Sequence, residues 1–222
     1  MSLAEATFGA GGTEPYAAAL RDGELLYLRD ARERSTNRVT MDVSRWNADA
    51  DAADLTLLES VTGPVLDIGC GPGRMVRAAL AVGMQALGLD VSPAAIALAG
   101  RLGGVYHEGS IFDRVPGEGI WQTALLVDGN VGIGGNIPAL LARCRDVLAP
   151  SGEIVVELHH DPHHHEHYLG EIVDSHGGTS AVFPWAEIGR QSLLELLPGL
   201  GLRRVQCWEI DGRSFCRLAK TR

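Results

Sequence analysis

The sequence of 222 residues predicts an α/β fold: a doubly wound, mostly parallel sheet of seven strands that ends in an antiparallel hairpin. Three observations carry this prediction. Short apolar runs alternate with helical segments between residues 49 and 158, which is the order of a parallel sheet with helices on both faces. The first of these runs ends in a glycine-rich turn that opens directly into a helical pattern. Near the C-terminus, two strand-like runs are joined by Asp211-Gly212, a typical two-residue hairpin turn.

Residues 1–48 are expected to form an N-terminal arm and cap outside this sheet. Glycines before Pro15 predict an arm, and Pro15 itself suits the first turn of a helix. An arginine-rich segment without a clear period follows and ends at Arg45. This segment is either a solvated face or a cap over a ligand site, and Arg38, Arg45 or Trp46 would then reach the ligand.

Residues 49–222 are expected to form a single domain. Its first helix, over 49–61, carries acids in the first turn, where they favour the helix dipole, and Gly63-Pro64 ends it. The five parallel strands are expected at 65–68, 84–90, 105–107, 121–127 and 153–158, with helices over 74–82, 93–101 and 138–148 between them. The helix after the second strand has Ser92 as its N-cap and proline in its first position.

An inserted loop and hairpin are expected at about 159–185, before the C-terminal hairpin. The loop, over 159–167, holds six of the eight histidines of the chain. The hairpin is expected to turn around His176-Gly177-Gly178, and a helix is expected from Trp185 to Leu197. Phe183-Pro184-Trp185 either lines a substrate pocket with aromatic surface or packs in the core.

The composition excludes several classes of partner. A net charge of −9 and a pI near 5.3 disfavour non-specific binding to nucleic acid or to an anionic membrane, and no apolar run has the length of a membrane span. No signal-peptide pattern opens the chain, so we expect a cytoplasmic protein, either a monomer or a homodimer. The hairpin turn places Cys207 opposite Cys216, and in a reducing cytoplasm we expect two free, packed thiols there.

The glycine-rich turn indicates a nucleotide site. Gly69, Gly71 and Gly73 follow a buried strand and open a helix, so backbone N–H groups can approach a ligand closely. The next strand ends in Asp90, an acid that can accept hydrogen bonds from ribose hydroxyls. Asp67 lies in the strand just before the glycines.

The pattern Asp67-x-Gly69-x-Gly71-x-Gly73, followed by Asp90-Val91-Ser92-Pro93, resembles the motifs of class I S-adenosylmethionine-dependent methyltransferases. The resemblance covers about residues 50–160. It implies S-adenosylmethionine as cofactor and a small-molecule methyl acceptor. By this resemblance the first acid contacts the methionine part, the glycine turn with Cys70 passes beneath the cofactor, and the second acid with Val91 holds the ribose.

Two further segments take part in the resemblance. The family usually has Gly-Asp after the third strand, where it holds the adenine; here Ser110 and Ile111 follow Gly109, and Ser110 is expected to take that place. Asp128, after the fourth strand, occupies the motif near the methyl-transfer position. It is a candidate both for cofactor binding and for catalysis.

Two other functions remain open. A nicotinamide-dependent oxidoreductase would need a third glycine three residues after the second, but Arg74 stands there. A non-catalytic cofactor-binding protein would use the histidine-rich loop to bind metal. A dedicated metal site needs fixed ligand geometry, which a loop need not supply, so we expect a solvated loop and no metal.

Methyl transfer needs a general base only when the nucleophile carries a proton. Asp128 and His159 are the preferred candidates, because they follow the ends of the fourth and fifth strands at the rim of the expected cleft. His107 and His160 are further candidates.

Overall fold

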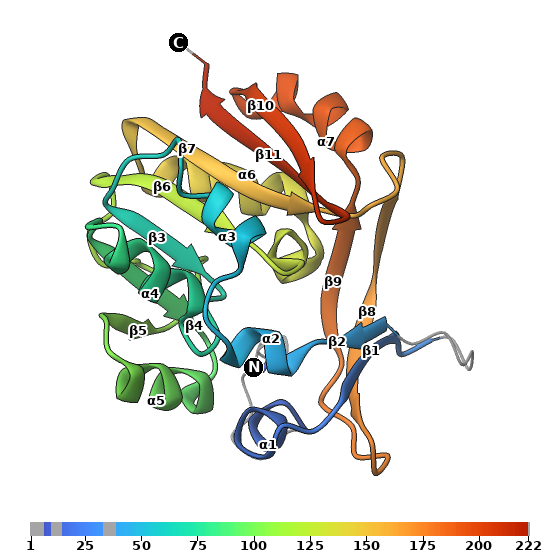
Figure 1. Ribbon diagram of the computed structural model, residues 1–222. Coiled ribbons are helices and arrows are strands. Elements are labelled where there is room, and N and C mark those ends of the chain that lie inside the picture. Colours follow the sequence, from blue (N-terminus) through green and yellow to red (C-terminus); the bar gives the residue numbers. More distant parts are fainter. Residues whose placement is uncertain (1–6, 10–14, 33–38, 222) are drawn as a thin grey trace.

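The computed structural model describes residues 7–9, 15–32 and 39–221 (Figure 1). Its main sheet has the strand order β10-β11-β7-β6-β3-β4-β5. The five strands from β7 to β5 in that order run parallel, β11 is antiparallel to β7, and β10 is antiparallel to β11. This confirms the predicted doubly wound sheet and its C-terminal hairpin. Arg38 and most of the predicted arm lie outside the described residues.

The elements of this sheet follow the predicted order. The strands are β3 (Val65–Ile68), β4 (Ala86–Asp90), β5 (Tyr106–Glu108), β6 (Trp121–Leu126), β7 (Leu148–Leu158), β10 (Leu202–Ile210) and β11 (Arg213–Lys220). The helices are α3 (Ala52–Thr56), α4 (Arg74–Ala81), α5 (Pro93–Leu102), α6 (Ile137–Val147) and α7 (Arg190–Leu196), with 3₁₀ turns η1 (Asn130–Gly135) and η2 (Leu197–Leu200). Ser92 caps α5 as predicted, with its side chain accepting the N–H of Ala95.

Helices cover both faces of the sheet, so its central strands are buried on each side (Figure 1). Successive side chains of a strand point to opposite faces. Leu66 and Ile68 of β3 therefore join the core beneath α6 and α7, whereas Val65 joins the core beneath α3 and α4. All four residues of β3 are buried, Asp67 among them, as expected for a strand covered on both faces.

A second, four-stranded antiparallel sheet forms beside the main one, and we call it the cap sheet. Its strand order is β2-β1-β8-β9, with β1 (Leu26–Asp30), β2 (Val39–Met41), β8 (His165–Asp174) and β9 (Phe183–Ile188). Together with α1 (Pro15–Asp22) and α2 (Val43–Asn47) it encloses a core of its own, which includes Leu26, Ile172 and Phe183. The start of the chain thus pairs with the insertion (Figure 1).

Several elements predicted in and after the insertion have other bounds in the structure. Strand β8 begins at His165, so the last part of the histidine-rich tract is strand rather than loop. The segment from Trp185 to Ile188 belongs to β9, and the helix begins only at Arg190. Trp185 packs in the cap core, and Ala186 and Ile188 pack in the core of the main sheet. Burial on both sides favours a strand for this segment. The helix predicted over 49–61 is also shorter, ending at Thr56.

The state predicted for the C-terminal cysteines was wrong as well. Cys207 and Cys216 are paired in register, as expected, but they form a disulfide, with their Cα atoms 4.1 Å apart. Such close Cα atoms are typical of a pair without mutual backbone hydrogen bonds, whose side chains lie nearest each other. Cys70 and Cys144 are free and buried.

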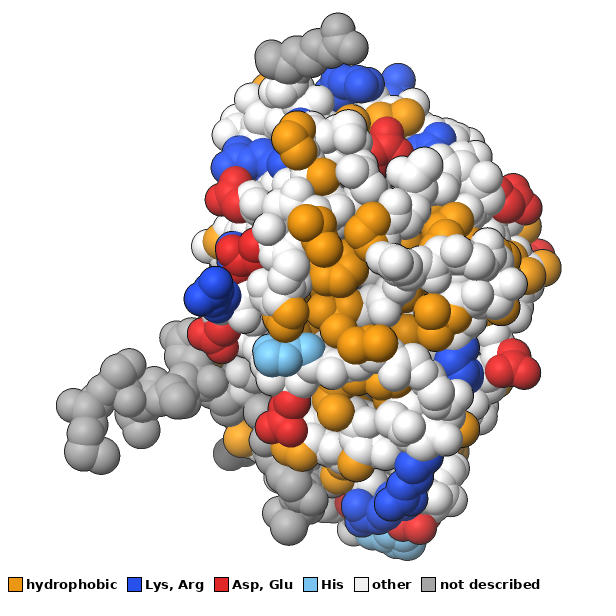
Figure 2. All heavy atoms as spheres, turned by 90° about the vertical axis from the view of Figure 1, so that its left-hand side faces the viewer, with side chains coloured by type: hydrophobic (Ala, Val, Ile, Leu, Met, Phe, Trp, Pro, Cys, Tyr) orange, Lys and Arg blue, Asp and Glu red, His pale blue; other side chains and the backbone are white. Residues whose placement is uncertain are grey.

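The opposite edge of the main sheet is formed by β5, which has three residues. Hydrophobic side chains gather on this side of the molecule (Figure 2), and Leu80, Leu102 and Val105 are among the exposed ones. A short edge strand leaves few backbone groups for pairing with another chain. Of the helices that the structure describes, none has the length and apolar character needed to cross a membrane.

Candidate active site

The glycine turn between β3 and α4 forms the floor of a cavity. Gly69 has a φ of +70°, and a Cβ there would lie 2.6 Å from Nδ2 of Asn130. That amide donates hydrogen bonds to the carbonyl oxygens of Ile68 and Gly69, at 3.0 and 2.9 Å. Only glycine combines this conformation with such a close approach. Asn130, which the sequence analysis did not select, therefore holds the turn in place.

Asp90 fixes the other side of the turn. Its Oδ2 accepts the N–H of Gly71 and its Oδ1 accepts the N–H of Ser92, both at 2.8 Å. Burial raises the pKa of Asp90, and these backbone hydrogen bonds oppose the rise. The carboxylate is thus oriented by the backbone at the carboxyl end of β4, the edge of a parallel sheet at which ligands bind.

Asp67 is nearly inaccessible, with 3% of its surface exposed, but it lines the same cavity. Burial raises its pKa to about 8, and the charges of Asp128 and Asp90 add to the rise. A nearby positive charge would lower this pKa again. Asp67 is therefore suited to a cationic ligand group.

The cavity has a volume of about 360 Å³, within the range of small-molecule sites. Nine of the residues predicted for the site line it: Asp67, Gly69, Cys70, Gly71, Asp90, Val91, Ser110, Ile111 and Asp128. Gly73 instead precedes α4 as its N-cap, with a φ of +85°, and packs against the ring of Tyr106.

Aromatic side chains from the cap form the roof of this first cavity. Phe8 and Tyr16 are in edge contact at 5.1 Å between ring centroids, and Tyr16 and Trp46 at 5.9 Å. Trp185 from β9 lines this cavity and also packs in the cap core. Phe183 packs in the cap core and is not among the residues that line the cavity. The sequence analysis missed Phe8 and Tyr16, because nothing local relates them to the glycine turn.

A network of charges at the cavity joins Arg45 of α2 to Arg74 of α4 and Arg213 of β11. Asp54, fully buried, is paired with Arg45 and Arg213 at 2.8 Å each and with Arg74. Arg74 also pairs with Asp128, which Arg45 approaches to 3.1 Å. Buried charges are tolerated only when they are paired in this way.

Asp128 therefore already has strong partners. Its φ is +55°, and its backbone N–H donates to Oε2 of Glu157 at 2.7 Å. Burial raises the pKa of Asp128, whereas Arg74 and Arg45 lower it. Glu157 is itself held by two hydrogen bonds from Arg213, at 2.7 and 2.8 Å.

A second cavity of about 290 Å³ adjoins the first. The two share Met41, Trp46, Asp128 and Trp185 as lining residues. His159 lines the second cavity, as do Arg45, Glu157 and Glu187. Burial lowers the pKa of His159, with a further contribution from His164, so the neutral ring is favoured. His107 and His160 are not among the described residues that line either cavity.

Comparisons with known proteins agree with this geometry. The sequence model of a family described as a methyltransferase domain matches residues 65–152, which include the glycine turn and both acids. No curated protein sequence matches the chain significantly.

Solved structures share the fold at low sequence identity. A methyltransferase of Bacteroides fragilis, dependent on S-adenosylmethionine and crystallised with S-adenosyl-L-homocysteine, has a TM-score of 0.79 at 18% identity, with 100% of both chains covered. The 1,6-didemethyltoxoflavin-N1-methyltransferase of Burkholderia thailandensis has a TM-score of 0.59 at 19% identity, covering 80% of this chain and 81% of its own. CalS10 of Micromonospora echinaspora, an amino pentose methyltransferase, has a TM-score of 0.57 at 18% identity, and the match covers 80% of this chain and 94% of its own.

The family model therefore identifies residues 65–152 as a methyltransferase domain, and the whole chain shares the fold of solved S-adenosylmethionine-dependent methyltransferases.

Proposed function

We propose that the enzyme transfers the methyl group of S-adenosylmethionine to a small-molecule acceptor that binds in the second cavity. One observation carries this proposal: the cavity lined by the motif residues adjoins a second one, and the two share Trp46, Asp128 and Trp185. A donor in the first cavity would then face an acceptor in the second. Two of the structural neighbours are named for small acceptors, 1,6-didemethyltoxoflavin and an amino pentose.

The first cavity offers groups for each part of the cofactor. We assign Asp67 to the methionine amino group, since a buried carboxylate gains from a cation. Asp90 is assigned to the ribose hydroxyls, and Ser110 with Ile111 to the adenine. The glycine turn, with Cys70 and Val91 on its flanks, supplies backbone contact.

In this proposal, residues 1–48 form a cap over the site, and residues 49–222 form the main domain. The insertion of the main domain contributes β8 and β9 to the cap sheet. The ion pairs of Arg45 support this arrangement, because they join a residue of the cap to Asp54 and Asp128 of the main domain. The cap excludes water and orients the acceptor. Orientation is the main contribution needed, since the methyl group of a sulfonium is already activated.

Asp128 and His159 are the groups that we assign to the acceptor side. Asp128 lines both cavities, but arginines are paired with both of its oxygens. We therefore give it a positioning role rather than that of a base. His159 lines the second cavity and favours its neutral form, and we assign it to contact with the bound acceptor.

Calorimetric titration tests the cofactor assignment. S-adenosylmethionine and S-adenosylhomocysteine should bind, and NAD(H) should not. Asp90→Ala should weaken S-adenosylhomocysteine binding about 10- to 100-fold through loss of the ribose contact. Glu108→Gln is the matched control, because Glu108 is exposed and is the register partner of Asp90 on β5. Equal affinities of the two variants would contradict the ribose assignment.

Incubation with methyl-labelled S-adenosylmethionine tests the acceptor class. Label should pass to the small-molecule fraction of a cell extract. Label in the protein or nucleic-acid fraction alone would refute a small-molecule acceptor. The net charge of −9 supports an enzyme that does not act on nucleic acid, and we propose a cytoplasmic location.

A further inference from the structure

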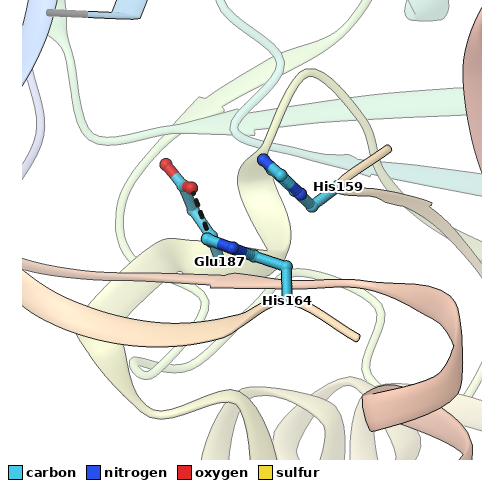
Figure 3. A group of neighbouring side chains, drawn as sticks. All are labelled: His159, His164 and Glu187. Carbon is cyan, nitrogen blue, oxygen red and sulfur yellow. Dashed lines mark hydrogen bonds and ion pairs between the residues drawn. The ribbon is translucent and has the colours of Figure 1, made fainter. Parts of the chain in front are cut away.

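Three side chains, two of which line the second cavity, form a cluster with the composition of a metal site. His159 follows β7, His164 precedes β8, and Glu187 lies in β9 (Figure 3). One ligand atom from each lies within 4.8 Å of the others. We propose that these three residues bind a divalent transition-metal ion, zinc in the first instance, with an open coordination position toward the second cavity.

The donor set selects the kind of metal. Two imidazoles and one carboxylate suit zinc, cobalt or nickel, whereas magnesium and calcium prefer oxygen ligands. Two histidines with one glutamate are also a ligand set of catalytic zinc sites, which leave the fourth position to water or substrate. His159 and Glu187 line the second cavity, so that position would face its interior.

The three side chains already point toward one another. The rings of His159 and His164 are stacked, with 3.8 Å between centroids, and Nε2 of His164 lies 3.1 Å from Oε2 of Glu187 (Figure 3). Ligand atoms around a tetrahedral zinc ion are about 3.3 Å apart, given bonds of about 2.0–2.1 Å. Side-chain rotations that shorten the longest separation between ligand atoms, at most 4.8 Å, by roughly 1.5 Å would give this tetrahedral spacing.

The charges also favour a cation. Among the described residues, the charged partner of Glu187 is His164, and no arginine or lysine forms an ion pair with this carboxylate. Neutral imidazole is the form of histidine that binds metal. Glu166 adds a second carboxylate, 3.9 Å from Nε2 of His164.

The backbone of the loop is fixed at both ends, which the sequence alone did not indicate. The N–H of His159 donates to the carbonyl of Ile188 at 2.9 Å, and the N–H of Gly189 donates to the carbonyl of His164 at 2.8 Å. A Cβ at position 189 would lie 2.7 Å from the carbonyl carbon of Pro162, so glycine lets the loop pack against the end of β9. The ligands therefore come from ordered segments.

Hydrogen bonds from neighbouring groups orient the ligands. The hydroxyl of Tyr168 donates to Oε1 of Glu187 at 2.8 Å, which leaves Oε2 for a cation. Such outer partners are typical of metal sites. The N–H of Asp161 donates to Nδ1 of His159 at 3.2 Å. Ligation through either nitrogen of that ring replaces this long and exposed hydrogen bond, which contributes little.

Zinc titration of the full-length protein, against a fluorescent chelator as competitor, tests the site. The wild type should bind one zinc ion per chain in this site. His164→Gln and Glu187→Gln should each weaken that binding at least tenfold. His163→Gln and His167→Gln are matched controls, because both side chains are exposed members of the same tract outside the cluster, and they should change the affinity less than twofold.

Unfolding measurements separate loss of the site from loss of the fold. Zinc should raise the melting temperature of the wild type and of both controls, but not that of His164→Gln or Glu187→Gln. All variants should still bind S-adenosylhomocysteine, since the cluster lies outside the first cavity. The site is refuted if the wild type binds no zinc at micromolar concentration, or if the controls weaken binding as much as the cluster variants do.

Cobalt tests the open position without any methyl acceptor. The cobalt-loaded protein should show a visible absorption spectrum that shifts when acetohydroxamic acid, a chelating probe, is added. An unchanged spectrum would show that the ion has no exchangeable position toward the cavity. Both results are independent of methyl transfer, so they stand apart from the proposed function.

Discussion

Binding of the cofactor is expected to depend on pH through Asp67. Burial raises the pKa of this carboxyl to about 8, and the charges of Asp128 and Asp90 add to the rise. A carboxylate that contacts the methionine amino group must be ionised, so protonation competes with cofactor binding. The affinity for S-adenosylhomocysteine should therefore fall as the pH falls below about 8.

The size of the effect follows from that pKa. The carboxyl is about 1% ionised at pH 6 and about 90% ionised at pH 9. If only the ionised form binds, the affinity rises roughly 90-fold over this range, or about 2.7 kcal/mol. Calorimetry at half-unit pH steps measures it. The amino group of the ligand also titrates, so the affinity ratio of wild type to Asp67→Asn isolates the contribution of Asp67.

A ratio that stays constant from pH 6 to pH 9 would refute the reasoning. 5′-Methylthioadenosine provides a second control, because it lacks the amino acid part of the cofactor. Its affinity should not follow the Asp67 titration. If it does, the pH dependence comes from a contact with another part of the ligand.

Two pairs of variants test the turn and the charge network by urea unfolding. Gly83→Ala introduces a Cβ at a φ of +81° with nothing within 4 Å and should cost about 1–2 kcal/mol. Gly69→Ala introduces a Cβ at a φ of +70° and 2.6 Å from Nδ2 of Asn130, so it should lower the unfolding free energy by at least about 1 kcal/mol more than Gly83→Ala does. Equal losses for the two variants would show that the Asn130 amide moves aside freely. Arg74→Met leaves buried acids with one arginine fewer and should lower the unfolding free energy by about 3–5 kcal/mol. Arg190→Met, which removes an exposed ion pair, should change it by less than about 1 kcal/mol, and a similar small loss for Arg74→Met would mean that the other arginines compensate.

The parts of the fold that follow local rules could be predicted from the sequence. Buried parallel strands appear as apolar runs bounded by glycine and proline, and Ser92 before a proline marks a helix start. The cofactor motif is also local, because the glycine turn and the acids that flank it come from two consecutive strands. Six of its predicted residues, namely Asp67, Gly69, Cys70, Gly71, Asp90 and Val91, consequently line one cavity.

The parts that depend on distant pairing could not be predicted. β1 pairs with β8 across the chain, and its short apolar run has no partner nearby in sequence. The charge network likewise joins Asp54 to Arg213, which are 159 positions apart, so neither residue has a local signal. The histidine cluster depends on Glu187, in a segment that the sequence assigned to a helix.

The cap sheet cannot form until late in the synthesis of the chain, because β1 pairs with β8. Arg29 and Glu171, side by side in this sheet, are 142 positions apart. At 5–20 residues per second the ribosome needs about 7–28 s to make the intervening chain. During that time β1 and β2 form at most an isolated hairpin, which is only marginally stable in water. The apolar side chains of Leu26 and Leu28 stay unprotected meanwhile, so the nascent N-terminal region is expected to be a substrate for chaperones until β8 emerges.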